Sequence, residues 1–277
     1  MHARLEKAYH FITQNGRPID QARFAYHFMR TDASQDALLN TLSQYQNTDG
    51  GFGHGLEPDI SAPVSNPFAT ELALLIYCQA NVPPEHPMVQ RTVAYLEQTQ
   101  DETGNWRFSP EVYESPLAPW FQHWEWPSLN PSCTISGLLK ELGSGSEQLH
   151  RRVEELFANL GNVHDLTGDE YYNVRPYVYY FFPIWDHPQR YLYTSGVAWW
   201  LIRQADSLDG DHFFSFVRSP ESSVARLLPP TLIEQRLQDL ANEQAEDGGW
   251  PSPYSNHWRG WITVQNLLVL QAFGKLD

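Results

Sequence analysis

A seven-residue phrase occurs twice in this chain and constrains its fold more than any other feature. Residues 46–52 and residues 244–250 both read Gln-x-x-Asp-Gly-Gly-aromatic. Each copy follows an amphipathic helical stretch and precedes an irregular segment that leads into a more apolar helix. A phrase that recurs at matching places in two helical hairpins indicates an internal repeat. A degenerate third copy, at residues 98–106, keeps the order Gln, Asp, Gly, aromatic with two extra residues.

The residue types of the phrase suit the turn at the end of a helix. Glycine tolerates positive φ angles, so Asp-Gly-Gly predicts a sharp turn after the first helix of each hairpin. The aromatic residue then packs back on the hairpin, and the glutamine side chain can hydrogen-bond the exposed backbone of the turn. The sequence therefore predicts helical hairpins joined by turns of one kind.

This pattern resembles the QW motif of the terpenoid cyclases and of the β-subunits of protein prenyltransferases. Those proteins share an α/α toroid, in which paired helices form two concentric rings around a central cavity. The resemblance implies an all-α fold, with a single α/α toroid and a central cavity over residues 1–277. Twelve helices of about 20 residues with short turns account for a chain of this length. Function belongs to a site rather than to a fold, so the resemblance leaves the activity open.

Hydrophobic periodicity predicts the helices of the hairpins. Polar, amphipathic stretches indicate outer helices, and more apolar stretches that follow a loop indicate inner helices. The N-terminal pair covers about residues 2–14 and 18–30. The expected outer helices cover residues 34–45, 88–97, 147–158 and 232–242, and the expected inner helices cover residues 67–80, 131–142, 195–204 and 263–273. Pro67 and Pro131 suit the first turn of their helices, and Asn66 and Asn130 stand at the capping positions before them. The period blurs at residues 163–193, where aromatic residues crowd together, and residues 209–230 read as a loop.

Composition and charge exclude some functions. The 277 residues are 42% hydrophobic, which suits one domain with a large core. The formal net charge of −15 argues against a nucleic-acid partner. No apolar run approaches the roughly 18 residues of a membrane span, and the chain opens in an amphipathic helix without a signal peptide. The two cysteines, Cys78 and Cys133, suit a reducing cytoplasm. We expect a cytoplasmic protein whose partner is a small-molecule substrate or ligand.

The segment after the first Gly-Gly turn carries the first candidate site. In a toroid such segments cover one mouth of the cavity, and long loops there are often functional. This one contains His54, Glu57 and Asp59, and Glu71 lies one turn inside the following helix. Carboxylates beside an imidazole suit acid–base catalysis, so these four residues are predicted to be catalytic. Alternatively, Glu57 and Asp59 brace a surface loop and His54 is solvated.

A second loop places Glu125 between Trp124 and Trp126 and ends at Asn130. A carboxylate between two indoles can be desolvated, which raises its pKa toward that of a general acid. Glu125 is therefore the fifth catalytic candidate, and Trp124, Trp126 and Asn130 are predicted to line the cavity. In the alternative, the tryptophans plug the rim and Glu125 points to water.

Three further polar residues are predicted to bind a ligand in the cavity. Residues 251–261 carry His257 and Arg259, and Arg259 can bind an anion or pair with an acid. Asp186, followed by His187, comes after the aromatic cluster. Asp-His-Pro is also an ordinary sequence at the start of a helix.

The catalytic motifs of the resembled families are incomplete in this chain. The Asp-x-Asp-Asp acid of class II cyclases does not occur, and Ser132 stands where oxidosqualene cyclases have the acid of their Asp-Cys-Thr motif. Protein prenyltransferases bind zinc through Asp-x-Cys and a later His, which Cys133 and His257 match, but Pro131 replaces the Asp. Two ligands fall short of the three that a catalytic zinc needs. We therefore predict no metal and no cofactor, with Cys133 a small buried residue.

Three functions remain open on the sequence. The first is a prenyltransferase- or cyclase-like protein that binds an apolar or isoprenoid ligand, uses one of the five acid–base candidates and stabilises cations with aromatic rings. The second is a carbohydrate-active lyase or glycosidase, in which tryptophans stack on sugars and two carboxylates share the chemistry. The third is a non-catalytic ligand-binding or scaffold domain.

Overall fold

The computed structural model describes residues 3–29, 34–181 and 186–276. Over these ranges the chain forms thirteen α-helices and five short 3-10 helices, and it contains no β-strand. The expected all-α class is therefore confirmed. No helix in the described ranges is both long enough and apolar enough to cross a membrane. Phe182 and Trp185, which belong to the aromatic-rich stretch of the sequence, lie outside the described residues.

The chain divides into two compact units, which are described one at a time. Unit 1 comprises Met1–Thr41 and Tyr191–Asp277, so both ends of the chain belong to the same unit. Unit 2 is the continuous segment Leu42–Arg190. The single domain over residues 1–277 and its ring of helices stay predictions.

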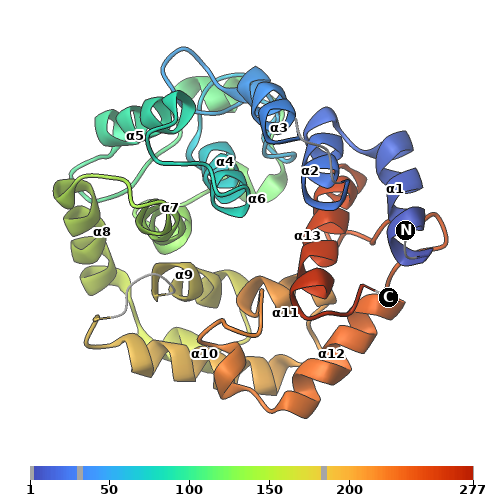
Figure 1. Cartoon of the computed structure of the whole chain (residues 1–277). Helices are drawn as coiled ribbons and strands as arrows, with labels where there is room; N and C mark the ends of the chain where they lie inside the picture. The colour runs from blue at the N-terminus through green and yellow to red at the C-terminus, as the bar shows by residue number, and fades with distance from the viewer. Residues whose placement is uncertain (1–2, 30–33, 182–185, 277) are drawn as a thin grey trace. The chain divides into compact units, whose positions relative to one another are not determined.

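Unit 2 is built from two layers of helices (Figure 1). The helices α4 (Pro67–Gln79), α7 (Leu129–Glu141) and α9 (Tyr171–Phe181) pack side by side as one layer. The second layer contains α5 (Pro87–Thr99) and α8 (Glu147–Leu160). In the first layer, ten or more consecutive residues of α4 and of α7 are buried, whereas α5 and α8 each bury one face. The expected contrast between apolar and amphipathic helices is confirmed here.

The shorter helices of unit 2 lie in its loops. They are η1 (Ser43–Tyr45), η2 (Pro110–Glu114), α6 (Pro119–Gln122) and η3 (Val163–Thr167).

Unit 1 is organised around α13 (Arg259–Ala272), which packs against four other helices: α1 (Ala3–Asn15), α2 (Pro18–Phe28), α11 (Gly210–Phe216) and α12 (Pro230–Asn242). Its remaining helices are α3 (Ser34–Leu42), α10 (Arg190–Gln204), η4 (Ala225–Leu227) and η5 (Asn256–Trp258). The boundary between the units cuts one residue from α3 and one from α10. Helices from the two ends of the chain thus share one core.

The glutamine of the repeated phrase ties its turn to a neighbouring helix, as its predicted role requires. In all three copies Nε2 donates to two carbonyl oxygens, one on the glycine four residues later and one near the start of another helix. The pairs are Gln46 with Gly50 (3.0 Å) and Met88 (3.1 Å), Gln100 with Gly104 (3.5 Å) and Leu149 (3.1 Å), and Gln244 with Gly248 (2.8 Å) and Arg4 (3.1 Å).

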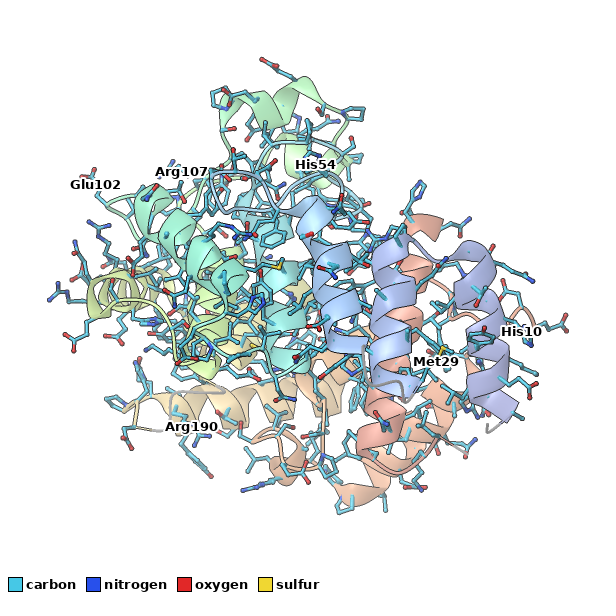
Figure 2. The ribbon with its side chains drawn as sticks, turned by 45° about the horizontal axis from the view of Figure 1, so that its top comes forward. His10, Met29, His54, Glu102, Arg107 and Arg190 are labelled. Atoms are coloured by element: carbon cyan, nitrogen blue, oxygen red, sulfur yellow. The ribbon has the colours of Figure 1, made fainter. Side chains whose placement is uncertain are left out.

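The structure corrects the alignment of the third copy. Gln100, not Gln98, makes the equivalent hydrogen bonds, so this copy contains no extra residues. Its acid has moved from the fourth position of the phrase to the second, Asp101, which accepts from the backbone N–H groups of Thr103 (2.8 Å) and Asn105 (3.1 Å). Glu102 and Arg107 of this turn are labelled in Figure 2, just beyond α5.

Glycine is required at one position of each turn. Gly50, Gly104 and Gly248 have φ angles of 95°, 85° and 93°. A Cβ atom at these positions would lie 2.2 to 2.4 Å from a carbonyl oxygen of the neighbouring helix. The left-handed backbone and the close approach both exclude a side chain. The turn therefore works as a contact between helices as well as a helix end.

Two expectations about unit 1 are wrong. Residues 209–230, read as a loop, contain α11, whose Phe213, Phe214 and Phe216 are buried, together with η4. The helical period cannot be seen over a helix of seven residues. The second error is the inner helix expected at residues 195–204. It forms the later part of α10, where Trp199 and Ile202 are exposed.

Candidate functional site

Three polar side chains from three helices meet inside unit 2. The guanidinium of Arg175 on α9 donates from Nη2 to Oε1 of Glu71 on α4 (2.5 Å) and from Nη1 to Oδ1 of Asn130 on α7 (3.2 Å). It also lies over the ring of Tyr179, 5.2 Å from the centroid. The Glu71 side chain is 5% exposed and that of Arg175 is 18% exposed. We call Glu71, Asn130 and Arg175 the Glu71–Arg175 site.

The start of α4 fixes the position of Glu71. Asn66 caps the helix, with Oδ1 accepting from the N–H of Ala69 (2.9 Å), and Pro67 is its first residue. Both roles were predicted from the sequence, and they set Glu71 one turn inside the helix.

Asn130 behaves differently from its predicted role as a helix cap. Ser128 caps α7 instead, and Asn130 has an extended backbone (φ −95°, ψ 126°) within the first turn. Its side-chain oxygen accepts from Arg175. The close approach of α7 and α9 depends on Gly137, where a Cβ atom would lie 2.1 Å from the carbonyl oxygen of Tyr179. The extended backbone places Asn130 directly before the continuous helix that starts at Pro131, as predicted, but its side chain binds Arg175.

The charges of the pair are set by burial and by each other. Burial raises the pKa of Glu71 above its ordinary value of 4.5, although the charge and hydrogen bond of Arg175 lower it. Burial lowers the pKa of Arg175, but the charge and hydrogen bond of Glu71, together with Tyr171 and Tyr179, outweigh burial and hold that pKa well above the ordinary value. The guanidinium stays protonated, so Glu71 is the group of this pair that can exchange a proton.

An aromatic cluster begins one turn away on α4. Phe68 precedes Glu71 by three residues and so lies on the same side of the helix. Its ring lies 4.9 Å from that of Trp124 and 4.7 Å from that of Phe121, centroid to centroid, and Trp124 lies 6.2 Å from Trp126. Trp124 and Trp126 are half-buried. The Nε1–H of Trp124 is buried and meets no acceptor among the described residues. An acceptor oxygen of a ligand would satisfy this donor.

The loop that was predicted to be catalytic is held by its own contacts. Glu57 is buried, and its Oε1 accepts from the backbone N–H of Asp59 (3.3 Å). The Asp59 carbonyl accepts from the N–H of Ala118 (3.0 Å). His54 is exposed, pairs through Nε2 with Oδ1 of Asn47 (2.9 Å), and lies among the loops of unit 2 in Figure 2. These contacts fit the bracing alternative, and of the four predicted residues Glu71 belongs to the Glu71–Arg175 site.

Glu125 is not desolvated in the structure. Its neighbours Trp124 and Trp126 pack into the aromatic cluster, but Glu125 itself is exposed. Because both indoles pack into the cluster, the carboxylate between them is directed into water. The expected desolvation of this acid is therefore absent.

Asp186 and its neighbour His187 stand at the end of unit 2. Asp186 is exposed, and Nδ1 of His187 accepts from the backbone N–H of Gln189 (3.1 Å), the arrangement expected at the start of a helix. This contact fits the alternative given for Asp-His-Pro.

Arg259 braces the last turn of unit 1. Its Nη1 and Nη2 donate to the two oxygens of Asp247, at 2.8 Å each, and its Nε donates to the carbonyl of Trp250 (3.1 Å). Arg259 thus pairs with an acid, one of its two predicted roles, and that acid belongs to the repeated phrase. His257, two residues earlier, is exposed.

Cys133, one of the two residues weighed for zinc, lies in an environment that disfavours a thiolate. Cys133 is completely buried in α7, and burial raises the pKa of its thiol well above the ordinary range. This opposes the thiolate that zinc binds. Within the described ranges, no three His, Cys, Asp or Glu side chains are grouped so as to hold a metal ion.

Sequence reasoning missed Arg175. The stretch Tyr171–Phe181 is aromatic and apolar except for this one cation and Asn173. A charge inside a buried run needs a partner, so the signal was present in the sequence. The sequence does not indicate which residue is that partner, because Glu71 lies 104 residues away in the chain.

No protein family, no curated protein and no solved structure matches the chain.

Proposed function

We propose that this protein is a cyclase- or prenyltransferase-like α/α toroid that binds a largely apolar, isoprenoid-like ligand at the Glu71–Arg175 site. The observation that carries the proposal is a protonatable carboxyl, buried beside an aromatic cluster and held by Arg175. A carboxyl whose pKa is raised by burial is suited to donate a proton. Aromatic faces stabilise the cation that protonation of an alkene produces.

Each residue has a distinct part in this proposal. Glu71 gives its proton to an alkene carbon of the ligand and becomes a carboxylate. Arg175 stabilises that carboxylate through its charge and its 2.5 Å hydrogen bond, and Asn130 orients the guanidinium. The rings of Phe68 and Trp124 face the apolar part of the ligand. A base, or Glu71 itself, then takes a proton from the cation and closes the cycle.

The toroid is supported by the contacts of the repeated turns. Each of the three turns joins its own hairpin to the start of another helix. The turn of Gln244 contacts Arg4 in the first helix of the chain. A turn that ties its hairpin to the start of another helix is the kind of contact expected between neighbouring hairpins of an α/α toroid. The acidic charge and two free cysteines support a cytoplasmic protein with no nucleic-acid partner.

The test uses a linear isoprenoid polyene with the purified protein in D2O. Native mass spectrometry measures binding, and gas chromatography with mass spectrometry measures deuterium in the recovered hydrocarbon. We expect wild type to bind the polyene and to introduce deuterium. Glu71→Gln should retain binding and lose deuterium incorporation by about a hundredfold or more. The matched control is Glu102→Gln, an exposed position of the third turn, which should behave as wild type.

A carbohydrate-active enzyme is the second candidate, favoured by the tryptophans of the loop before α7. Trp120 is 48% exposed, and Trp124 and Trp126 are half-buried. Exposed indoles stack on sugar rings, and Arg175 with Asn130 can bind the carboxylate of a uronic acid. The carbohydrate-active candidate is favoured if wild type binds an oligouronate instead of the polyene and Arg175→Met does not bind it. If the protein binds neither probe, both proposals fail and the non-catalytic alternative stands.

A further inference from the structure

A second group of side chains with catalytic geometry lies in unit 1. Oδ2 of Asp209 lies 2.7 Å from Nδ1 of His212, and Nε2 of the same imidazole lies 2.5 Å from the hydroxyl of Tyr254. The three groups form a continuous line of hydrogen bonds from a carboxylate through an imidazole to a phenol. A nucleophile, a base within hydrogen-bond reach and a third group that orients the base are the signature of nucleophilic catalysis.

The start of α11 builds the first half of this line. Asp209 is the residue that caps α11, and its Oδ1 accepts from the backbone N–H of His212 (2.9 Å). The same carboxylate therefore holds the backbone of His212 with one oxygen and its side chain with the other. The neighbours Phe213 and Phe214 are buried, which anchors the helix that carries the imidazole. His212 is fixed in place before any ligand binds.

The donors and acceptors follow from the charge of Asp209. Burial raises the pKa of this carboxyl, but the hydrogen bonds from His212 and the nearby positive charge, which includes Arg236, together outweigh burial and hold the pKa below its ordinary value of 3.8. An ionised carboxylate can only accept, so Nδ1 of His212 carries the hydrogen. When the imidazole is in its neutral form, Nε2 is then an acceptor and the Tyr254 hydroxyl donates to it. The proton of Tyr254 thus already points at a base.

The surroundings of Tyr254 suit an electrophile with an apolar group. Tyr254 is half-buried, and the side chain of His212 is 15% exposed. The ring of Tyr254 has the His212 ring on one side, at 5.6 Å, and the Trp258 ring at 5.9 Å. The phenol oxygen lies in a partly desolvated, aromatic setting in which a base removes its proton more effectively than water does.

We propose that Asp209, His212 and Tyr254 form a nucleophilic site, in which the Tyr254 oxygen attacks the carbonyl carbon of an ester with an apolar acyl group. As the new O–C bond forms, the phenol proton passes to Nε2 of His212. The ester C–O bond breaks, and the imidazolium returns the proton to the departing alcohol. Water then hydrolyses the acyl-tyrosine by the same route, releasing the acid and restoring the phenol. Asp209 is a positioning residue that stabilises the imidazolium.

This inference is independent of the Glu71–Arg175 site, because it uses residues of unit 1 and an ester chemistry. The test uses 4-nitrophenyl acetate with the full-length protein. Release of 4-nitrophenol is followed in a stopped-flow instrument, and acid-quenched protein is digested to locate the acetyl group. We expect a burst of product and an acetyl group on Tyr254. Tyr113, which is 48% exposed, is the reference tyrosine and should be acetylated at least about tenfold more slowly.

Four variants separate catalysis from folding. Tyr254→Phe keeps the ring and loses the nucleophile, so the burst should fall at least about tenfold, and His212→Gln should have the same effect. Asp209→Asn keeps an excellent helix cap and removes the charge, so it should slow the burst several-fold at an unchanged melting temperature. Tyr113→Phe should leave the burst unchanged.

The proposal is overturned if Tyr254 is acetylated no faster than Tyr113, or if Tyr254→Phe keeps the burst. It is also overturned if Asp209→Asn folds as wild type and reacts at the wild-type rate, because the line of hydrogen bonds would then only anchor the loop. Should His212→Gln fail to fold, the other two variants at the site still decide the question.

Discussion

Each unit buries an arginine close to a carboxylate, and the two arrangements differ in what holds the carboxylate. In unit 1, Arg23 on α2 is fully buried, with its guanidinium 3.7 Å from the centroid of Trp261 and Nη2 donating to Gln265 (3.1 Å). The nearby carboxylate, Asp20, is also fully buried, and it accepts from the backbone N–H (3.2 Å) and from Nε (2.9 Å) of Arg17.

In unit 2 the carboxylate relies on the buried arginine itself. Glu71 is bound by Arg175, and that guanidinium also holds Asn130 and remains partly exposed. The arginines differ accordingly. Burial lowers the pKa of Arg23 to about 9 in spite of Asp20, whereas the pKa of Arg175 lies well above its ordinary value because of Glu71.

The difference separates a structural cluster from a candidate site. Asp20 belongs to a capping box at the start of α2, which satisfies the carboxylate locally and leaves Arg23 to pack on an aromatic face. Glu71 is satisfied across three helices and keeps a protonatable oxygen beside aromatic rings. A buried ion pair adds little net stability compared with apolar side chains of the same volume. The unit 2 pair is therefore better explained by function than by stability.

The largest expected effect is the loss of Arg175. Arg175→Met strands Glu71 in the interior and should lower the free energy of unfolding at pH 7 by roughly 3–5 kcal/mol. Arg23→Met leaves Asp20 with its Arg17 contacts and should cost about 1–2 kcal/mol, the value of a desolvated cation–π contact. Urea denaturation of both variants measures the difference.

A double variant and the pH dependence check this reasoning. Glu71→Leu combined with Arg175→Met should recover most of the stability, since no charge is left buried. The loss of unfolding free energy in Arg175→Met alone should shrink as the pH falls toward 4.5, the ordinary pKa of Glu71. The pKa of Glu71 is higher in the folded state than in the unfolded state, so at low pH the carboxyl is protonated in both states and its burial no longer costs stability. Equal losses for Arg175→Met and Arg23→Met would contradict the comparison.

The second-largest expected effect concerns His27 in unit 1, which feels the charge of Arg23. Burial, with a smaller contribution from the charge of Arg23, lowers the pKa of His27 from 6.5 to about 4. Because the folded-state value is the lower one, the stability from a neutral His27 is complete above pH 6.5 and is lost as the pH falls to about 4. The full loss is on the order of 3 kcal/mol.

The contribution of His27 is isolated by comparison with His27→Gln. Glutamine does not titrate, so the variant lacks the pH-dependent contribution of His27. The unfolding free energy of wild type, measured from pH 7 to pH 4, should therefore fall toward that of the variant. In Arg23→Met the loss of stability between pH 7 and pH 4 should be smaller than in wild type, since this substitution removes the second cause of the lowered His27 pKa. Parallel pH profiles for wild type and His27→Gln would rule out this account.

The smallest effect compares one substitution in the two units. Gly137→Ala places a Cβ atom 2.1 Å from the backbone carbonyl of Tyr179, whereas Gly260→Ala places one 2.5 Å from the side-chain Oδ2 of Asp20. Overpacking costs about 1–3 kcal/mol, and Ala regains up to about 1 kcal/mol in a helix. A backbone cannot yield as a side chain does, so Gly137→Ala should cost about 1–2 kcal/mol and Gly260→Ala less than about 1 kcal/mol. Thermal unfolding measures both, and the reverse order would show that the Asp20 cluster is the more rigid one.

Much of the fold could be predicted from local signals. The cap at Asn66 and the turns at Gly50 and Gly248 were predicted because a few adjacent residues specify them. The third turn was misaligned by two residues, because its Asp moved within the phrase and the order of residue types no longer marked the register. The helix α11 was missed because it is only seven residues long.

The candidate site was predicted only in part. Glu71 and Asn130 were both selected, for separate reasons, and neither reason involved the other residue. Glu125 was selected on the identity of its neighbours, but both indoles pack into the cluster and Glu125 is exposed. Tyr254 and His212 were overlooked because each stands alone in its own segment, 42 residues apart in the chain.

The sequence by itself determined the all-α class, the caps and the glycine turns that join one helix to the next. These features depend on backbone conformations that a few neighbouring residues allow or forbid. The tertiary structure alone decided which polar side chains meet. Arg175 reaches Glu71 across 104 residues and Asn130 across 45, through the packing of α4, α7 and α9. The interior leaves a charge no solvent, so packing rather than sequence distance chooses its partner.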